Sequence, residues 1–287
     1  MAVIFVDYPG FNLRLARELR AAGTRAKLVD FISPQVWAWH KGRLATMADY
    51  LDLMLCLFPF EKELFENAGL KSVWMGHPMV DQLEALRIEG GREEDLIGLF
   101  PGSRTREVRS LFPMMIASAE RLHAINPAWR YEAAAASDGL AEMMREVVRN
   151  SSLPAELVTI RTGTSQELMQ RATAGVVASG TATGEAGYYG MPYCLVYKVA
   201  WPTYLLARML VDLEHVGIVN ILAKRGVVHE FLQSEANADN VTSFLEFMMT
   251  EPERRRELQD DLLETAKLLG SGGAAERAAD AIVKLLD

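Results

Sequence analysis

Residues 96–104 read Leu-Ile-Gly-Leu-Phe-Pro-Gly-Ser-Arg, a short apolar run that ends in a glycine turn. An amphipathic pattern over Glu107–Ile125 follows, which predicts a buried strand, a tight turn and a long helix. Gly102 lets the backbone turn sharply, while Ser103 and the helix N-terminus offer donors to an anion. Arg104 adds a guanidinium fork suited to a diphosphate. The alternative is an ordinary strand-to-helix turn with a solvated arginine.

Short apolar runs and amphipathic segments alternate in both directions from this turn. Parallel strands that are buried on both faces read as continuous apolar runs, so the pattern predicts an α/β fold with parallel sheets. A polar, glycine-containing stretch, Arg87–Asp95, is expected to be a hinge between two domains. The predicted strands are Ala2–Asp7, Lys27–Ile32, Leu51–Phe58, Ser72–Met75, Leu96–Phe100, Arg130–Ala135, Leu157–Ile160, Gly175–Ala178 and Tyr193–Tyr197. The predicted helices include Leu13–Ala22, Glu61–Ala68, Glu107–Ile125, Gly139–Val148, Ser165–Ala172, Gly184–Gly190 and Tyr204–Leu210.

The start of the chain departs from a complete doubly wound domain. The sequence opens directly on a strand, and only about four strands precede the hinge, whereas such a domain usually has five or more. The glycine-rich loop that usually follows the first strand does not precede Asp7. We therefore expect the first domain to be truncated at its N-terminus.

Composition bounds the class of protein. The chain has 287 residues, of which half are apolar, so it can bury the cores of two domains. The net charge of −8 argues against a general grip on nucleic acid. Cys56 and Cys194 lie far apart in apolar runs without metal-ligand spacing, which predicts buried thiols and no metal site. No signal peptide opens the chain, and no apolar stretch reaches the ~20 residues of a membrane span, which predicts a soluble or surface-bound protein.

A second loop of small residues follows another predicted strand, at Ala178–Glu185. Ser179, Gly180 and Thr181 permit the close approach of a phosphate or ribose. Glu185, about one turn into the next helix, can accept hydrogen bonds from a ribose diol. Alone, such a loop also fits an ordinary helix cap. Two such loops at strand ends of one domain predict a nucleotide site.

Asp7 follows the first predicted strand, so it lies at the carboxyl end of the sheet and faces the crevice. A carboxylate there can act as a general base on an acceptor hydroxyl. It can equally form an Asx turn before Pro9 or cap the helix that begins at Leu13. From its position alone, neither interpretation is preferred.

Aromatic residues and a histidine follow other predicted strands. Trp37 and Trp39 lie in Ser33–Trp39, and their rings can stack on a sugar, although packing is the preferred interpretation. His77 lies in Met75–Met79 near the domain junction, where a structural histidine is the commoner case. All three are candidates for the acceptor side of the crevice.

These pieces occur in one order along the chain. The motifs are Val6–Asn12, Ser33–Trp39, Pro59–Lys62, Gly76–Met79, Pro101–Arg104, Ser179–Ala182 and Val219-Asn220. That order resembles lipid-A-disaccharide synthase, and the similarity runs from Ala2 to about Leu232. The Trp-Ala-Trp and Pro-Phe-Glu-Lys segments are unusual in combination. The Trp-Ala-Trp segment also argues against a UDP-sugar 2-epimerase, which shares the donor domain.

The resemblance implies a GT-B architecture of two Rossmann-like domains, the first one incomplete. Residues 1–88 would form the acceptor-side domain, 89–250 the UDP-sugar-binding domain, and 251–287 helices that pack back on the first domain. The implied reaction is an inverting, metal-independent transfer of 2,3-diacylglucosamine from UDP-2,3-diacylglucosamine to 2,3-diacylglucosamine 1-phosphate (lipid X). Its products are lipid A disaccharide 1-phosphate and UDP, and no cofactor is implied.

The resemblance also assigns roles to single residues. The family's essential aspartate falls on Asp7, its diphosphate arginine on Arg104, and its helix-opening glutamate on Glu185. Its nucleotide-loop asparagine falls on Asn220. Acylated substrates imply a cytoplasmic enzyme that is peripheral on the inner leaflet of the inner membrane, and a homodimer is left open.

Two departures from the family pattern matter. Gly10 stands where the family has a second aspartate, and the opening βα region with its Ser-Gly-Asp loop is absent. We therefore expect this form to have little activity alone. The alternatives are a catalytically impaired fragment that still binds a UDP-sugar and another GT-B enzyme such as a UDP-sugar 2-epimerase.

Overall fold

The computed structural model describes residues 1–39, 42–199 and 214–287, without the side chains of residues 38 and 39. It divides into two compact units. The first unit contains Met1–Glu84 and Lys267–Asp287, and the second contains residues 85–199 and 214–266. The predicted helix Tyr204–Leu210 lies outside the described residues. Within the described part of the chain, no helix is long and apolar enough to cross a membrane.

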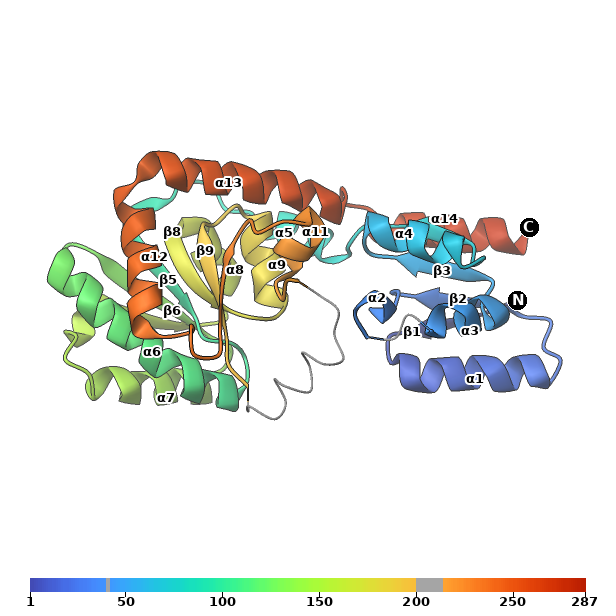
Figure 1. Cartoon of the computed structure of the whole chain (residues 1–287), viewed down its shortest axis with the longest axis horizontal. Coiled ribbons are helices and arrows are strands. Elements are labelled where there is room, and N and C mark those ends of the chain that lie inside the picture. Colours follow the sequence, from blue (N-terminus) through green and yellow to red (C-terminus); the bar gives the residue numbers. More distant parts are fainter. Residues whose placement is uncertain (40–41, 200–213) are drawn as a thin grey trace. The chain divides into compact units, whose positions relative to one another are not determined.

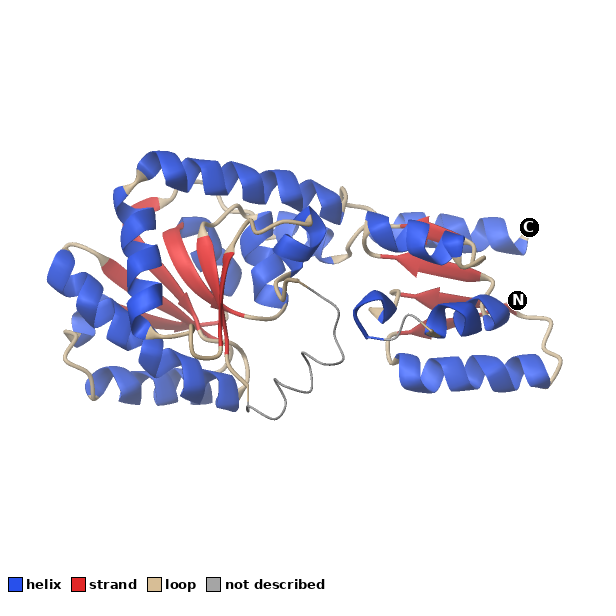
Figure 2. Cartoon of the chain, viewed as in Figure 1, coloured by secondary structure: helices blue, strands red, loops and turns tan. Residues whose placement is uncertain are grey.

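The first unit is built on a four-stranded parallel sheet with the order β1-β2-β3-β4 (Figures 1 and 2). Helices α1, α3 and α4 pack on one face of this sheet, and α14 packs on the other. The strands are β1 (Ala2–Val6), β2 (Lys27–Phe31), β3 (Leu53–Cys56) and β4 (Ser72–Trp74). The helices are α1 (Pro9–Ala21), α2 (Val36–Trp39), α3 (Arg43–Tyr50), α4 (Pro59–Asn67), α5 (Met79–Ala85) and α14 (Ala274–Leu286).

The motif Gly76–Met79 packs against the turn that precedes α14. Gly76 has a φ of +83°, and a Cβ atom there would lie 2.9 Å from Nη2 of Arg277. Nε of Arg277 donates to the carbonyl of Met75 at 2.8 Å. The backbone amide of Gly273 donates to Oδ1 of Asp81 at 2.8 Å. A side chain at position 76 would therefore strain the backbone and crowd the Arg277 guanidinium and the carbonyl of Leu269.

The second unit contains a six-stranded parallel sheet with the order β10-β9-β8-β5-β6-β7. The chain adds β6 and β7 on one side of β5 and then returns to add β8, β9 and β10 on the other side. The direction of strand addition therefore reverses between β5 and β8. The strands are β5 (Glu93–Phe100), β6 (Arg130–Ala135), β7 (Val158–Thr162), β8 (Ala172–Ala178), β9 (Tyr193–Tyr197) and β10 (His229–Leu232).

Helices cover both faces of this second sheet (Figure 1). Side chains of α6, α7 and α12 share one apolar core with the inward side chains of the strands. On the other face, α9 packs against β8 and against α8, α11 and α13. These helices are α6 (Thr105–Ile125), α7 (Asp138–Arg149), α8 (Ser165–Arg171), α9 (Thr181–Tyr188), α11 (Ile218–Ala223), α12 (Ala238–Thr250) and α13 (Pro252–Ala266). This is a doubly wound α/β arrangement.

Arg92 anchors the stretch Arg87–Asp95, which the sequence predicts to be a hinge. Its guanidinium donates to the carbonyls of Met169 and Ala172 at 2.7 Å each and to that of Tyr189 at 2.6 Å. Burial lowers the pKa of Arg92 to about 10. A cation at the C-terminal ends of α8 and α9 is favourable because it meets their unpaired carbonyls. This part of the predicted hinge is therefore fixed in the second unit.

The structure differs from the predicted organisation in three respects. The boundary between the units falls after Glu84, before the predicted position at residue 88. The segment 251–287 is divided, because α13 packs in the second unit and the chain joins the first unit only from Lys267. Strand β10 was not predicted, since it is a four-residue edge strand that contains His229 and Glu230.

Candidate active site

A cavity of about 740 Å³ lies at the carboxyl ends of the strands of the second sheet. Its walls come from the segments that follow β5, β8, β9 and β10, on both sides of the point where strand addition reverses. Open α/β sheets bind their ligands at such a point. The lining residues are Arg104, Arg106, Glu107, Ser110, Leu111, Ala178, Ser179, Tyr197, Lys198, Val199, Gln233 and Ser234.

The turn after β5 places Arg104 at the start of the long helix α6. Gly102 has a φ of +100°, and a Cβ atom there would collide with the carboxylate of Glu107. Nη1 of Arg104 donates to Oε1 of Glu107 at 2.8 Å, and the backbone amide of Arg104 donates to Oε2 at 3.3 Å. The Arg104 side chain is 81% exposed. Its remaining donors are therefore free to meet an anion in the cavity.

The turn after β8 contains the second group of residues that the sequence predicts to bind the UDP-sugar donor. Ser179 lines the cavity, and Gly180, with a φ of +149°, precedes the first residue of α9, Thr181. Glu185 lies one turn into α9 and accepts a 3.0 Å hydrogen bond from Nε2 of Gln166. Burial raises the pKa of Glu185, and the hydrogen bond opposes that rise. The structure thus brings Ser179 into one cavity with Arg104, because β5 and β8 are neighbours.

Asn220, which the resemblance assigns to a nucleotide loop, lies in α11 with its side chain buried. Its side chain is 1% exposed, and its Nδ2 donates to the carbonyl of Val228 at 2.9 Å and to Glu230 at 2.8 Å. Its Oδ1 accepts from the amides of Val227 and Val228 at 2.8 and 2.9 Å. The donor and acceptor atoms of this amide are therefore occupied by the turn between α11 and β10. Direct contact with a nucleotide is not what this geometry supports.

Lys198 and Gln233 are cavity residues that were not predicted. Lys198 directly follows β9, and Arg104 was predicted because it follows β5. The position of Lys198 after a strand was therefore a signal available in the sequence. Gln233 is buried, donates to the carbonyl of Val199 at 3.0 Å and accepts from its amide at 2.9 Å. It thereby holds the segment after β9 in place. In the described part of the lining there are three cations, Arg104, Arg106 and Lys198, and one carboxylate, which favours an anionic ligand.

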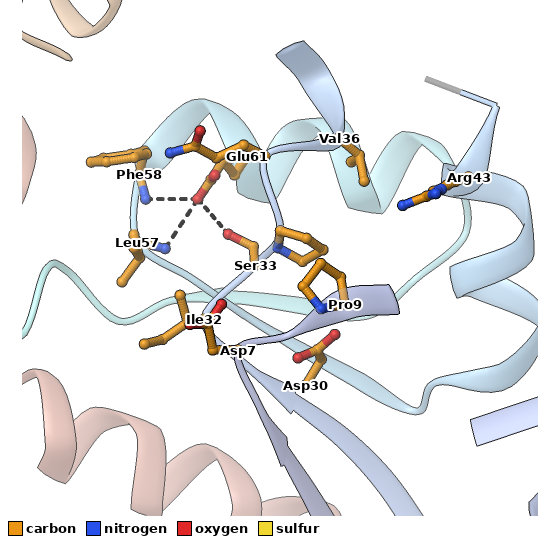
Figure 3. A pocket seen from close by; sticks show the side chains of 12 residues that line it. Asp7, Pro9, Asp30, Ile32, Ser33, Val36, Arg43, Leu57, Phe58 and Glu61 are labelled. Atoms are coloured by element: carbon orange, nitrogen blue, oxygen red, sulfur yellow. Dashed lines mark hydrogen bonds between the residues drawn. The ribbon is translucent and has the colours of Figure 1, made fainter. Parts of the chain in front are cut away.

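The first unit has its own cavity of about 480 Å³ at the carboxyl ends of β1, β2 and β3 (Figure 3). Asp7 enters it from the end of β1, Asp30 from β2, Arg43 from the start of α3 and Glu61 from α4. The remaining lining residues are Pro9, Ile32, Ser33, Pro34, Gln35, Val36, Leu57 and Phe58.

Asp7 lies on a strained turn that a buried asparagine holds. Asp7 and Tyr8 have left-handed φ values of 52° and 44°, a conformation that costs of order 1–3 kcal/mol for each residue. Nδ2 of Asn12 donates to the carbonyls of Val6, at 3.3 Å, and of Asp7. Among the described residues, none donates a hydrogen bond to the Asp7 carboxylate, and no side chain caps α1. The geometry therefore favours neither the Asx turn nor the helix cap. A Cβ atom at Gly10 would meet nothing within 4 Å, so packing does not require this glycine.

Glu61 is the buried centre of the wall between the Ser33–Trp39 segment and α4. Its carboxylate accepts from Oγ of Ser33 at 2.6 Å, from Nε1 of Trp37 at 3.0 Å, and from the amides of Leu57 and Phe58 at 3.1 Å each. Burial raises the pKa of Glu61, whereas these four donors lower it. From the sequence, Glu61 was identified only as a member of the motif Pro59–Lys62. The glutamate directly follows the apolar run 53–60, and this position was the available sign that its side chain is buried.

Trp37 and His77 serve packing and capping. The Trp37 ring meets Phe60 edge-on at 5.3 Å, and its indole N–H is used by Glu61. The side chain of Trp39 lies outside the described residues. Nδ1 of His77 accepts from the amide of Met79 at 3.2 Å at the start of α5, and burial lowers the pKa of His77. Trp37 and His77 therefore lie beside the cavity wall and outside its lining.

Two parallel α/β units, each with a cavity at the carboxyl ends of its strands, define a fold of the GT-B class. Solved structures agree on the fold. The S. aureus MnaA–UDP co-structure matches with a TM-score of 0.65 and 11% identity over 99% of this chain and 76% of that one. UDP-GlcNAc 2-epimerase from Neisseria meningitidis matches with a TM-score of 0.60 and 10% identity over 99% and 76%. MurG from Acinetobacter baumannii matches with a TM-score of 0.57 and 14% identity over 99% and 73%.

Sequence comparison identifies the family within that class. The model of the lipid-A-disaccharide synthetase family (LpxB) matches residues 1–284. Lipid-A-disaccharide synthase from Persephonella marina is 35% identical over 99% of this chain and 77% of that protein. The same enzyme from Syntrophus aciditrophicus is 37% identical over 96% and 73%. The chain belongs to the lipid-A-disaccharide synthetase family and is a glycosyltransferase. The epimerases share its fold alone, so the alternative of a UDP-sugar 2-epimerase is not favoured.

Proposed function

We propose that the second unit binds the UDP moiety of UDP-2,3-diacylglucosamine and that the first unit binds the acceptor, lipid X. The observation that carries this proposal is the cavity at the switch point of the second sheet. Arg104, Ser179 and Lys198 reach it from the ends of three neighbouring strands, β5, β8 and β9. A diphosphate between them would meet two cations and the N-terminus of α6.

Asp7 acts as the general base in this proposal. The acceptor hydroxyl attacks the anomeric carbon of the donor sugar as the bond from that carbon to the diphosphate breaks. Asp7 takes the hydroxyl proton, and UDP leaves with the bonding electron pair. One displacement from the face opposite the leaving group inverts the anomeric configuration. The exposed, unpaired carboxylate of Asp7 at the cavity supports this role, since a base needs a free acceptor near the reacting hydroxyl.

The leaving group does not need a metal ion in this proposal. Negative charge builds up on the diphosphate as the sugar–oxygen bond breaks. Arg104 and Lys198 can stabilise that charge together with the partial positive charge at the start of α6. Among the described residues, no group of three His, Cys, Asp or Glu side chains could hold a metal ion. The cationic lining is the support for this part of the proposal.

The acceptor side suits a phosphorylated, acylated sugar. Arg43 is a cation on the lining of the first cavity and can meet the 1-phosphate of lipid X. Tyr8, between Asp7 and Pro9 in the chain, and Phe11, two residues after Pro9, are 73% and 57% exposed. Exposed aromatic side chains favour contact with acyl chains or a bilayer surface. We place the enzyme on the inner leaflet of the inner membrane, facing the cytoplasm.

The test is a transfer assay with a stereochemical readout. The chain is incubated with UDP-2,3-diacylglucosamine and lipid X labelled in its phosphate, and the disaccharide is followed by chromatography. NMR of the product should show the anomeric configuration opposite to that of the donor, and excess EDTA should leave the rate unchanged. Retention of configuration or loss of activity with EDTA would contradict the mechanism. Heat on adding UDP without any disaccharide would reduce the function to donor binding.

A further inference from the structure

Asp30 is a buried carboxyl group on the wall of the first cavity, and the reaction proposed above does not use it. It lies in β2, where alternate side chains point to opposite faces of the sheet. Leu28 packs with α1 and α3, and Val29 packs with α14 on the other face. Asp30 therefore points to the face of α1 and α3, where it lines the cavity and is 2% exposed.

No donor among the described residues hydrogen-bonds to the Asp30 carboxyl, and its oxygens are not sealed off from the cavity that Asp30 lines. Among the described residues, the charged groups that face the same cavity are Asp7 from the end of β1, Arg43 from α3 and Glu61 from α4. The Glu61 carboxylate already accepts four hydrogen bonds from its own neighbours. Helix α1 turns Asn12 and Ala16 inward, and neither is charged. The Asp30 carboxyl is therefore open to a molecule that enters the cavity.

The protonation of Asp30 follows from its surroundings. Burial first, and then the negative charge of Asp7, raise the pKa of Asp30 from 3.8 to about 7. The group therefore holds its proton over much of the range below neutral pH. A protonated carboxyl offers one O–H donor and one carbonyl acceptor. That pair of groups matches a sugar hydroxyl, which both donates and accepts.

We propose that Asp30 is a second recognition residue of the acceptor cavity, which hydrogen-bonds a hydroxyl of the acceptor sugar and orients the attacking hydroxyl toward Asp7. The inference rests on the proposed function, in which this cavity takes the acceptor. Ionised Asp30 loses its donor and places a second negative charge beside Asp7. An acceptor that itself carries a phosphate then binds less well.

The experiment measures binding, so that it does not depend on turnover. The probe is glucosamine 1-phosphate, titrated into the full chain by calorimetry between pH 6 and pH 8.5. The variants are Asp30→Asn, which keeps the shape and polarity of the neutral side chain, and Asp30→Ala, which removes both. Asp49→Asn, at an exposed carboxylate on α3, is the matched control. The ratio of wild-type to variant affinity cancels the titration of the probe itself.

We expect the affinity of wild type relative to Asp30→Asn to fall by roughly tenfold or more between pH 6 and pH 8.5, as the neutral fraction of Asp30 falls. Asp30→Ala should bind the probe roughly tenfold more weakly at pH 6, the effect of one lost buried hydrogen bond. The control should follow wild type at every pH. Thermal melting of each variant shows whether it is folded, and the comparison with Asp30→Asn alone decides the question if Asp30→Ala unfolds.

A constant ratio between wild type and Asp30→Asn across this pH range would overturn the proposal. So would wild-type affinity in a folded Asp30→Ala variant. The outcome is separate from that of the transfer assay. A chain that shows the Asp30 effect on probe binding but no transfer would refute the proposed function alone. A chain that transfers sugar and shows no Asp30 effect would refute this inference alone.

Discussion

Oε2 of Glu61 accepts a 2.6 Å hydrogen bond from Oγ of Ser33, across 28 residues of sequence. The same oxygen accepts from the amides of Leu57 and Phe58, and the other carboxylate oxygen accepts from Trp37. One fully buried side chain therefore joins the end of β2, the segment after β3 and the start of α4. These are the elements that form one wall of the cavity in the first unit.

Replacing Glu61 with alanine should destabilise the first unit strongly. The change leaves four donors without an acceptor, two of them in fully buried hydrogen bonds, and each unsatisfied buried group costs about 1–3 kcal/mol. We expect the free energy of unfolding in urea to fall by about 3 kcal/mol or more, and Glu61→Gln to lose less because its amide oxygen can still accept. Glu63→Ala, at an exposed position on the same helix, is the control. Equal stability of Glu61→Ala and wild type would show that the network does not hold this wall.

Replacing Arg104 with alanine should weaken donor binding. Its exposed guanidinium lines the cationic cavity, and a charged hydrogen bond contributes about 1.5–3 kcal/mol. Calorimetric titration of UDP should show that loss in the binding free energy. Arg121→Ala is the matched control, since Arg121 lies further along α6 in an exposed ion pair with Asp239. Unchanged UDP affinity in Arg104→Ala would remove this residue from the donor site.

Replacing Asp7 with asparagine should reduce turnover and spare donor affinity. The base contacts the acceptor hydroxyl and not UDP, and its loss typically costs on the order of 10²–10⁴-fold in rate. Disaccharide formation and UDP titration, measured on the same preparation, separate the two effects. Asp49→Asn should behave as wild type in both assays. Near-normal turnover in Asp7→Asn would return Asp7 to a role in the turn alone.

The stability of the protein should depend on pH through Asp30. Burial and the charge of Asp7 raise the folded-state pKa of Asp30 to about 7, above its ordinary value of 3.8, so the stabilising contribution of the neutral carboxyl is full below pH 3.8 and is lost as pH rises through 7. Asp30→Asn cannot ionise. Its stability relative to wild type should therefore improve by roughly 2 kcal/mol between pH 5 and pH 8. Urea unfolding at both pH values checks this, and a constant difference would show that Asp30 is already ionised at pH 5.

Contact with a lipid surface should be weak and should involve Phe11. Acylated substrates require such contact, and we expect binding to anionic vesicles that salt mostly reverses. Phe11→Asp should lower the part that resists salt, because it puts a charge where an exposed ring stands. Phe247→Asp, at a similarly exposed ring on α12, is the control. Equal pelleting of the two variants with vesicles would place the lipid contact elsewhere.

The sequence by itself was sufficient for the class of fold and for the family. Apolar runs and amphipathic segments depend on local periodicity, so each of the predicted strands corresponds to a strand of the structure. Polar residues that directly follow predicted strands were expected at the carboxyl edge of a sheet. This expectation identified Asp7, Arg104 and Ser179, all of which line cavities. It works from sequence because a parallel sheet brings all carboxyl ends to one edge.

Only the tertiary structure decided which side chains are free to act. Asn220 is saturated by a turn, Glu61 is a buried structural centre, and Asp30 is a buried group without a partner among the described residues. None of these states can be read from the residue type or its spacing. Burial and hydrogen-bond partners come from segments distant in sequence, as the pairing of Ser33 with Glu61 illustrates. The low polarity that raises the pKa of Asp30 exists only once α1 and α3 have packed over β2.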